Sequence, residues 1–143
     1  MMDGAQVDER RNLTIGVLDA EATLLGFELE GEAALARVDI PPNLAGLFAS
    51  QQSGWYVQAL RPFGTGWVKV MPNSMFAAGI RLDVVDFDTD LDGDNIRQVS
   101  LGFNFRPTSD TVLKLNYVRG VSRDRFNNPS DFAKALFSIA TYF

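Results

Sequence analysis

The sequence predicts an all-β fold, an antiparallel meander of about seven strands. Apolar and polar residues alternate with a period of two over seven stretches, as they do in strands whose two faces meet different surroundings. The connections between these stretches tend to alternate between short turns and longer polar loops. The chain also ends on an aromatic residue, Phe143, after a stretch in which one register carries no charge.

The first two stretches predict a hairpin with one apolar side and one acidic side. Residues 14–24 and 27–35 each alternate small or apolar side chains with polar ones. Leu25-Gly26 between them fits a tight turn. The polar register of the hairpin consists of Asp19, Glu21, Thr23, Glu28, Glu30 and Glu32.

Four further stretches continue the pattern through the middle of the chain, over residues 55–59, 76–84, 98–106 and 111–117. Residues 106–110 predict a short turn, whereas long polar loops are expected over residues 41–53, 88–94 and 120–131. The link over residues 63–74 is the exception, because it is long where alternation calls for a short turn.

The last stretch, residues 133–143, has two interpretations. Phe132, Leu136, Ile139 and Phe143 have the spacing of one face of a helix. Counting in twos back from Phe143 instead gives the uncharged register of a strand, namely Thr141, Ile139, Phe137, Ala135 and Ala133. We expect a strand, because a period of two is strong in every stretch before this one.

The net charge and the absence of two residue types exclude several classes of function. The chain of 143 residues has a net charge of −5, which argues against a nucleic-acid partner because phosphates require a basic face. It contains no cysteine and no histidine, so thiolate metal sites and nucleophiles activated by histidine are excluded. We therefore expect no enzymatic activity and no organic cofactor.

Alternation alone leaves two possibilities for the apolar face. In the first, the apolar face is the core of a soluble β-sandwich. In the second, the apolar face meets lipid around a membrane barrel, and the polar face lines the lumen. Small residues and amides in the polar register suit a crowded, wet interior. Aromatic residues near strand ends suit the two membrane interfaces. These aromatic residues are Trp55, Phe63, Phe76, Phe87, Phe105 and Phe143.

The segment NIRQVSLGFNFRPTSDTVLKLNYVRG (residues 95–120) and the final strand ending in Tyr142-Phe143 resemble the C-terminal end of bacterial outer-membrane porins. The likeness extends from about Leu13 and is greatest to the group that includes phosphate-selective porins. It implies a transmembrane β-barrel in the cell outer membrane, with passive diffusion of small polar solutes or ions through a water-filled lumen. It also implies a lipid bilayer as surroundings and allows a homotrimer for a full-length protein.

In such porins the last strand carries a signal that the barrel assembly machinery reads. The positions that match this signal are Ala135, Phe137, Ile139 and Phe143. Thr141 departs from it, because the family usually has an aromatic residue there.

The resemblance further implies that strands are missing, since about 16 are common in this class. We expect residues 1–12 to be a polar N-terminal segment, disordered or at a truncation boundary, and residues 13–143 to be the C-terminal portion of a barrel. An incomplete barrel has open edges and forms no functional pore by itself.

On the porin interpretation, the polar register lines the pore. The acidic hairpin favours cations near that wall, which makes phosphate selectivity doubtful. The expected pore-lining residues are Asp19, Glu21, Glu28, Glu30, Glu32, Arg81, Asp83, Asn104, Arg106, Lys114 and Asn116.

Residues 88–93 (DTDLDG) match the first half of a calcium loop, with Asp88, Asp90 and Asp92 as candidate ligands. Val99 stands where the bidentate Glu is expected. We therefore favour an acidic hairpin loop with Asp-Gly turn chemistry over a calcium site. The alternative function is a soluble β-sandwich binding module that binds calcium weakly through this loop.

Overall fold

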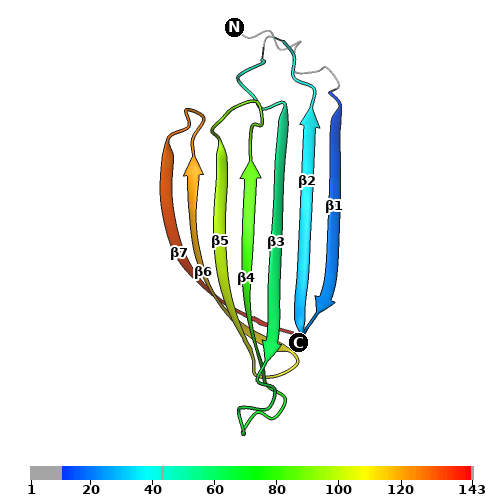
Figure 1. Cartoon of the computed structure of the whole chain (residues 1–143), viewed down its shortest axis with the longest axis vertical. Helices are drawn as coiled ribbons and strands as arrows, with labels where there is room; N and C mark the ends of the chain where they lie inside the picture. Colours follow the sequence, from blue (N-terminus) through cyan, green and yellow to red (C-terminus); the bar gives the residue numbers. More distant parts are fainter. Residues whose placement is uncertain (1–10, 43, 143) are drawn as a thin grey trace.

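Seven antiparallel strands form one sheet in the order β1-β2-β3-β4-β5-β6-β7, which confirms the predicted all-β meander (Figure 1). A computed structural model describes residues 11–42 and 44–142. The N-terminal segment predicted over residues 1–12 lies mostly outside this range. The strands are β1 (Leu13–Leu24), β2 (Phe27–Val38), β3 (Gln51–Phe63), β4 (Met75–Asp86), β5 (Asn95–Arg106), β6 (Thr111–Arg123) and β7 (Pro129–Thr141). The described residues include no helix long and apolar enough to cross a membrane.

The C-terminal stretch is a strand, as expected, and not a helix. β7 pairs with β6 along its whole length, from Arg123 opposite Pro129 to Thr111 opposite Thr141. The helical spacing of its large apolar residues is therefore incidental, because their backbone groups are committed to the ladder with β6. Phe143 lies outside the described residues.

The connection between β6 and β7 is shorter than the loop predicted over residues 120–131. The polar residues Ser122, Ser130 and Asp131 belong to the two strands. Asp124 closes the turn, since its Oδ1 accepts hydrogen bonds from the backbone N–H groups of Phe126 and Asn128, both at 2.9 Å. A polar composition indicated a loop, but the ladder extends into this segment from both sides as far as Arg123 and Pro129.

The connections differ between the two ends of the sheet, as the sequence predicted. The loop expected over residues 41–53 nevertheless ends at residue 50, because Gln51 to Ser53 pair with β2. One end has the tight Leu25-Gly26 turn, the β5–β6 turn (residues 107–110) and the longer β3–β4 loop (residues 64–74). The other end, called here the three-loop end, carries residues 39–50, 87–94 and 124–128 (Figure 1).

Strand pairing fixes which side chains share a face, because successive side chains of a strand point to opposite sides. We define the polar face by one row of directly opposed residues that crosses all seven strands. This row is Glu21, Glu30, Gln58, Arg81, Ser100, Val118 and Lys134. The neighbouring row on the opposite, apolar face is Ala22, Leu29, Ala59, Ile80, Leu101, Tyr117 and Ala135.

The sheet has almost no apolar core. Among the described residues, the buried hydrophobic side chains are Ala77 and Val118, and both lie on the polar face. In contrast, Leu101, Phe103 and Leu115 on the apolar face are 52%, 43% and 53% exposed. The side chains in the middle of the polar face are half-buried although they are polar, which places this face on the concave side of the curved sheet (Figure 1).

The three-loop end is closely packed around Gly93. A Cβ atom at this position would lie 2.0 Å from the backbone oxygen of Asp124. The backbone N–H of Asp94 donates to that same oxygen at 2.9 Å. The β4–β5 loop and the β6–β7 turn can therefore meet only because residue 93 has no side chain.

We expect Gly93→Ala to destabilise the fold by about 1–3 kcal/mol, the usual cost of forcing extra atoms into a packed site. Gly16→Ala is the control, because a Cβ there has no atom within 4 Å. The midpoint of denaturant unfolding, followed by circular dichroism, measures both. Equal midpoints for the two variants would contradict the tight contact at Gly93.

Candidate functional site

The centre of the polar face carries a connected set of polar side chains, and the register of β2 to β4 brings them together. Glu30 lies opposite Gln58 in the ladder, and Gln58 lies opposite Arg81. The Glu30 carboxylate accepts a hydrogen bond from Gln58 Nε2 at 2.6 Å and another from the Tyr56 hydroxyl. The neighbouring strand β3 thereby holds this carboxylate in place with two donors.

Arg81 extends the set towards β5. Its guanidinium carbon lies 3.6 Å from the centroid of the Tyr56 ring, a cation–π contact, and its Nε lies 2.6 Å from Asp83 Oδ1. The second oxygen of Asp83 accepts a hydrogen bond of 3.4 Å from Gln98. An ordered polar layer therefore runs from β2 to β5.

Carboxylates lie directly opposite one another on the β1–β2 hairpin. Asp19 pairs with Glu32, and Glu21 pairs with Glu30. Like charges in such positions repel each other unless water or cations screen them. A hollow of about 640 Å³ borders this part of the face and is lined by Glu21, Glu28 and Glu30 together with Gln58. The acidic hairpin therefore requires a hydrated environment.

The part of the polar face that β5 to β7 form is basic. Arg106 on β5 and Lys114 on β6 are both exposed, and β7 adds Lys134 to the same face. Between these charges, Asn116 fills the space above Gly102, where a Cβ would lie 2.9 Å from Asn116 Oδ1. The face therefore changes from acidic at β1 and β2 to basic at β5 to β7.

All residues expected to line a pore lie on the polar face. This placement follows from strand pairing, and their role in a pore stays a prediction. They are Asp19, Glu21, Glu28, Glu30, Glu32, Arg81, Asp83, Asn104, Arg106, Lys114 and Asn116.

Three residues of the central polar layer were missed as site candidates, namely Tyr56, Gln58 and Gln98. Each belongs to the polar register of its strand. Taking every residue of that register as a site candidate would therefore have included all three. Their contacts with Glu30, Arg81 and Asp83 depend on strand pairing and could not be read from any single stretch.

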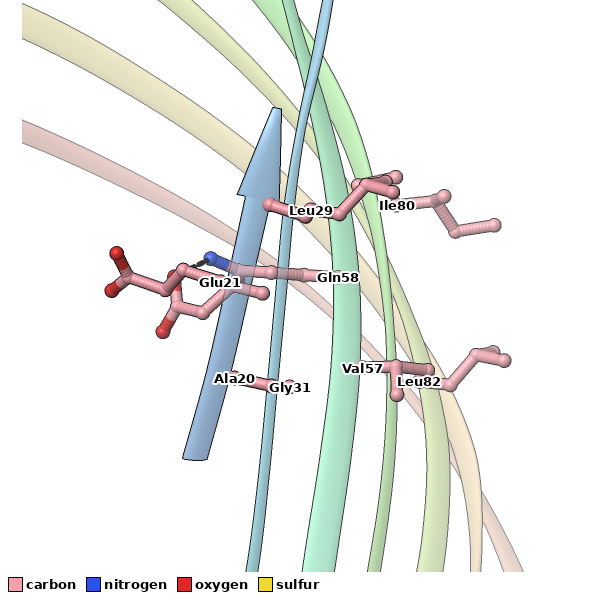
Figure 2. Close-up of a pocket in the computed structure, with 11 residues that line it drawn as sticks. Ala20, Glu21, Leu29, Gly31, Val57, Gln58, Ile80 and Leu82 are labelled. Atoms are coloured by element: carbon pink, nitrogen blue, oxygen red, sulfur yellow. Dashed lines mark hydrogen bonds between the residues drawn. The ribbon is translucent and has the colours of Figure 1, made fainter. Parts of the chain in front are cut away.

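The apolar face is also hollowed, between β1 and β4. This hollow has a volume of about 510 Å³, and small residues such as Ala20, Ala22 and Gly31 leave room for it beside Ile80 and Leu82. Figure 2 shows Ile80 and Leu82 pointing to one side of the sheet, while Glu21 and Gln58 point to the other. The close-up makes the separation of the two faces visible.

The aspartates of the candidate calcium loop contact other groups. Asp88 is buried, and its Oδ2 lies 3.8 Å from Arg125 Nη2. Its Oδ1 accepts the backbone N–H of Asp90, whose own carboxylate accepts Ser50 Oγ at 2.7 Å. No group of three metal-ligating side chains converges within residues 11–42 and 44–142. Calcium binding by Asp88, Asp90 and Asp92 stays a prediction.

Arg125 connects the three loops at the three-loop end. Its guanidinium donates to the backbone oxygens of Gly46, at 2.9 Å, and Leu47, at 3.3 Å, in addition to facing Asp88. The β6–β7 turn is thereby joined to the β2–β3 and β4–β5 loops. No local pattern in the sequence indicates this role, because the partners of Arg125 lie far away in the chain.

Three of the four residues proposed as an assembly signal lie together on the apolar face of β7, and the fourth, Phe143, lies outside the described residues. Phe137 and Ile139 are 63% and 62% exposed, and Ala135 shares their side of the strand. Thr141, where the signal usually has an aromatic residue, forms a hydroxyl–hydroxyl hydrogen bond of 2.9 Å with Thr111. This contact gives the departure a local structural reason.

No protein-family model matches the chain, and comparisons with curated proteins and with solved structures found no significant match.

The β6–β7 turn should respond to acid. Hydrogen bonds donated by the Asn128 side chain and backbone, and by the Phe126 backbone, hold the pKa of Asp124 below its usual value. A lowered pKa stabilises the folded turn above the ordinary Asp range, and this stabilisation is lost as pH falls through the folded pKa.

We therefore expect amide hydrogen exchange at Phe126 and Asn128, corrected for intrinsic rates, to accelerate as the pH falls below the ordinary Asp range. Asp124→Asn should remove this pH dependence. Protection that does not change with pH in the unmodified chain would contradict the assignment.

Proposed function

We propose that this chain forms the C-terminal part of the wall of a bacterial outer-membrane porin. Small polar solutes or ions would diffuse passively through its water-filled lumen, without catalysis and without an organic cofactor. One observation carries the proposal, namely that the sheet leaves its apolar face exposed and keeps its charged network on the concave face.

The apolar face is difficult to reconcile with water as its surroundings. Water-soluble monomers rarely expose apolar patches larger than a few hundred Å². Here large apolar side chains, including Val57, Ile80, Leu82, Leu101 and Leu115, remain 40–53% exposed across β3 to β6. In a bilayer the same side chains would meet hydrocarbon, which is the arrangement that barrel strands adopt.

Strand length supports the same interpretation. The seven strands have 12 or 13 residues each, more than the approximately 9–11 that a tilted membrane strand needs. Every strand can therefore cross the hydrocarbon and still project into the interface. Aromatic side chains gather near one end of the apolar face, where Phe76 and Phe105 stack with centroids 4.7 Å apart.

The polar face suits a lumen. The opposed carboxylates of β1 and β2 need water or cations, and a water-filled channel supplies both. These acidic groups would favour cations near this part of the wall. Phosphate selectivity is therefore not part of the proposal.

The open edges define what must complete the barrel. β1 and β7 each pair with only one neighbour in the described sheet, and a bilayer offers no hydrogen-bonding partner for their outer edges. Because seven antiparallel strands leave both edge strands running in the same direction, a barrel with only antiparallel neighbours needs an odd number of further strands. We propose that the remainder of a longer porin supplies them.

The soluble sandwich has less support. A sandwich requires a second sheet packed over the apolar face, and the described strands form a single sheet. Leu101, Phe103 and Leu115 are not buried together. The remaining support for a calcium-assisted module is the DTDLDG sequence of residues 88–93.

Cell fractionation of the full-length gene product tests the proposal. We expect recovery with outer membranes and a heat-dependent change in electrophoretic mobility in detergent, because folded barrels resist unfolding until heated. A known periplasmic protein from the same cells serves as the fractionation control. Recovery in the soluble fraction would exclude the porin.

Matched leucines on the two faces give a second test. Leu115 on the apolar face of β6 and Leu136 on the polar face of β7 are 53% and 50% exposed. Leu115→Arg should destabilise the protein in phospholipid vesicles by about 2–4 kcal/mol if it lies near the bilayer midplane. Leu136→Arg should have little effect, because its side chain would point into water.

Urea unfolding of the full-length gene product in vesicles of phosphatidylcholine measures both variants. The proposal fails if Leu115→Arg is tolerated as well as Leu136→Arg.

A further inference from the structure

The β3–β4 loop (residues 64–74) differs from the other connections at its end of the sheet. It is longer than the β1–β2 and β5–β6 turns and extends beyond the strand ends (Figure 1). It is also more apolar, with the sequence GTGWVKVMPNS. Trp67 and Val70 are 70% and 85% exposed in it, and Met71 is exposed as well. A loop surrounded only by water gains nothing from such side chains.

The loop is folded. The backbone N–H of Trp67 donates to the backbone oxygen of Gly64 at 3.1 Å. The N–H of Met71 donates to the oxygen of Val68 at 2.8 Å, and the N–H of Ser74 donates to the oxygen of Met71 at 2.9 Å. These bonds satisfy backbone groups within the loop itself. Its apolar side chains are therefore presented by an ordered backbone, and not by a loose segment.

Trp67 attaches the loop to the apolar face. Its ring lies 5.7 Å from Phe63 in an edge-on contact and 6.2 Å from Phe76, both measured between centroids. Phe63 and Phe76 pair in the row that continues to Phe105, Leu113 and Ile139 on the apolar face. Gly64 makes this approach feasible, since a Cβ there would lie 2.8 Å from the Trp67 ring.

The loop combines the residue types that favour a membrane interface. An indole has an apolar body and one N–H donor, so it partitions to the level of the lipid headgroups. Lys69 lies between Val68 and Val70 and is exposed, so its ammonium group can reach phosphates while apolar neighbours enter the acyl region. The loop extends the aromatic end of the apolar face, which would itself meet hydrocarbon.

We propose that the β3–β4 loop is an interfacial anchor that inserts Trp67, Val70 and Met71 at the boundary between lipid headgroups and acyl chains. Its partner is the bilayer surface, with Lys69 placed for an anionic headgroup. The inference rests on the proposed function, because it takes the apolar face to meet lipid. It explains why this connection is long where a short turn would suffice.

The chain contains two tryptophans, which makes the test direct. Trp55 lies on the apolar face of β3 towards the three-loop end, and Trp67 lies beyond the other end of the same strand. Trp55→Phe leaves Trp67 as the only reporter, and Trp67→Phe leaves Trp55. Each variant is made in the full-length gene product, with any tryptophan outside these 143 residues replaced by phenylalanine. It is then refolded into phosphatidylcholine vesicles, with and without phosphatidylglycerol, that carry quenchers at shallow or deep positions of the lipid.

For Trp67 we expect emission at shorter wavelength in vesicles than in buffer, and stronger quenching by shallow than by deep quenchers. Trp55 should also be quenched, which shows that the strand has inserted. In the variant that keeps only Trp67, Lys69→Glu should reduce the shift gained with phosphatidylglycerol. Lys134→Glu on the polar face is the matched control and should leave that shift unchanged.

The outcomes separate the two proposals. Quenching of Trp55 with Trp67 still exposed to water overturns the anchor and leaves the porin standing, and a protein partner for the loop would then be indicated. Deep quenching of Trp67 also overturns an interfacial position. If neither tryptophan responds to vesicles, the membrane proposal fails and the anchor fails with it.

Discussion

The pairing register of the seven strands is the constraint on which the rest of the structure depends. Because side chains alternate along every strand, one consistent register places Glu21, Glu30, Arg81 and Lys134 in a single row and keeps apolar residues in the next. A slip of one residue in any pair would carry charges to the apolar face of every strand beyond it. The separation of polar and apolar side chains is thus a property of the whole sheet.

This register gives a sheet without a conventional core. Backbone ladders and the polar layer around Glu30, Tyr56 and Arg81 hold the concave face together. Within the described part of the chain, no second layer covers the apolar face. Burial of apolar area is the dominant favourable contribution to folding in water. A sheet that leaves Leu101 and Leu115 half-exposed obtains little of that contribution from burial within its own fold.

At both ends of the sheet, the connections between strands form specific packing contacts. At the three-loop end, Gly93 and Arg125 draw three separate connections into one packed unit. At the other end, the long β3–β4 loop folds onto the apolar face through Trp67. In both places the decisive contacts join residues from different connections or elements, and each depends on a glycine that leaves room for a close approach.

The sequence by itself determined the strands, their order as a meander, and the membership of each side chain in a polar or an apolar register. These follow from the period of two, which is a local consequence of the backbone pleat. Only the tertiary structure shows that the polar face is concave, that Ser122, Ser130 and Asp131 belong to strands, and that Asp88 faces Arg125. Such contacts depend on curvature and on residues distant in the chain, and no local pattern encodes them.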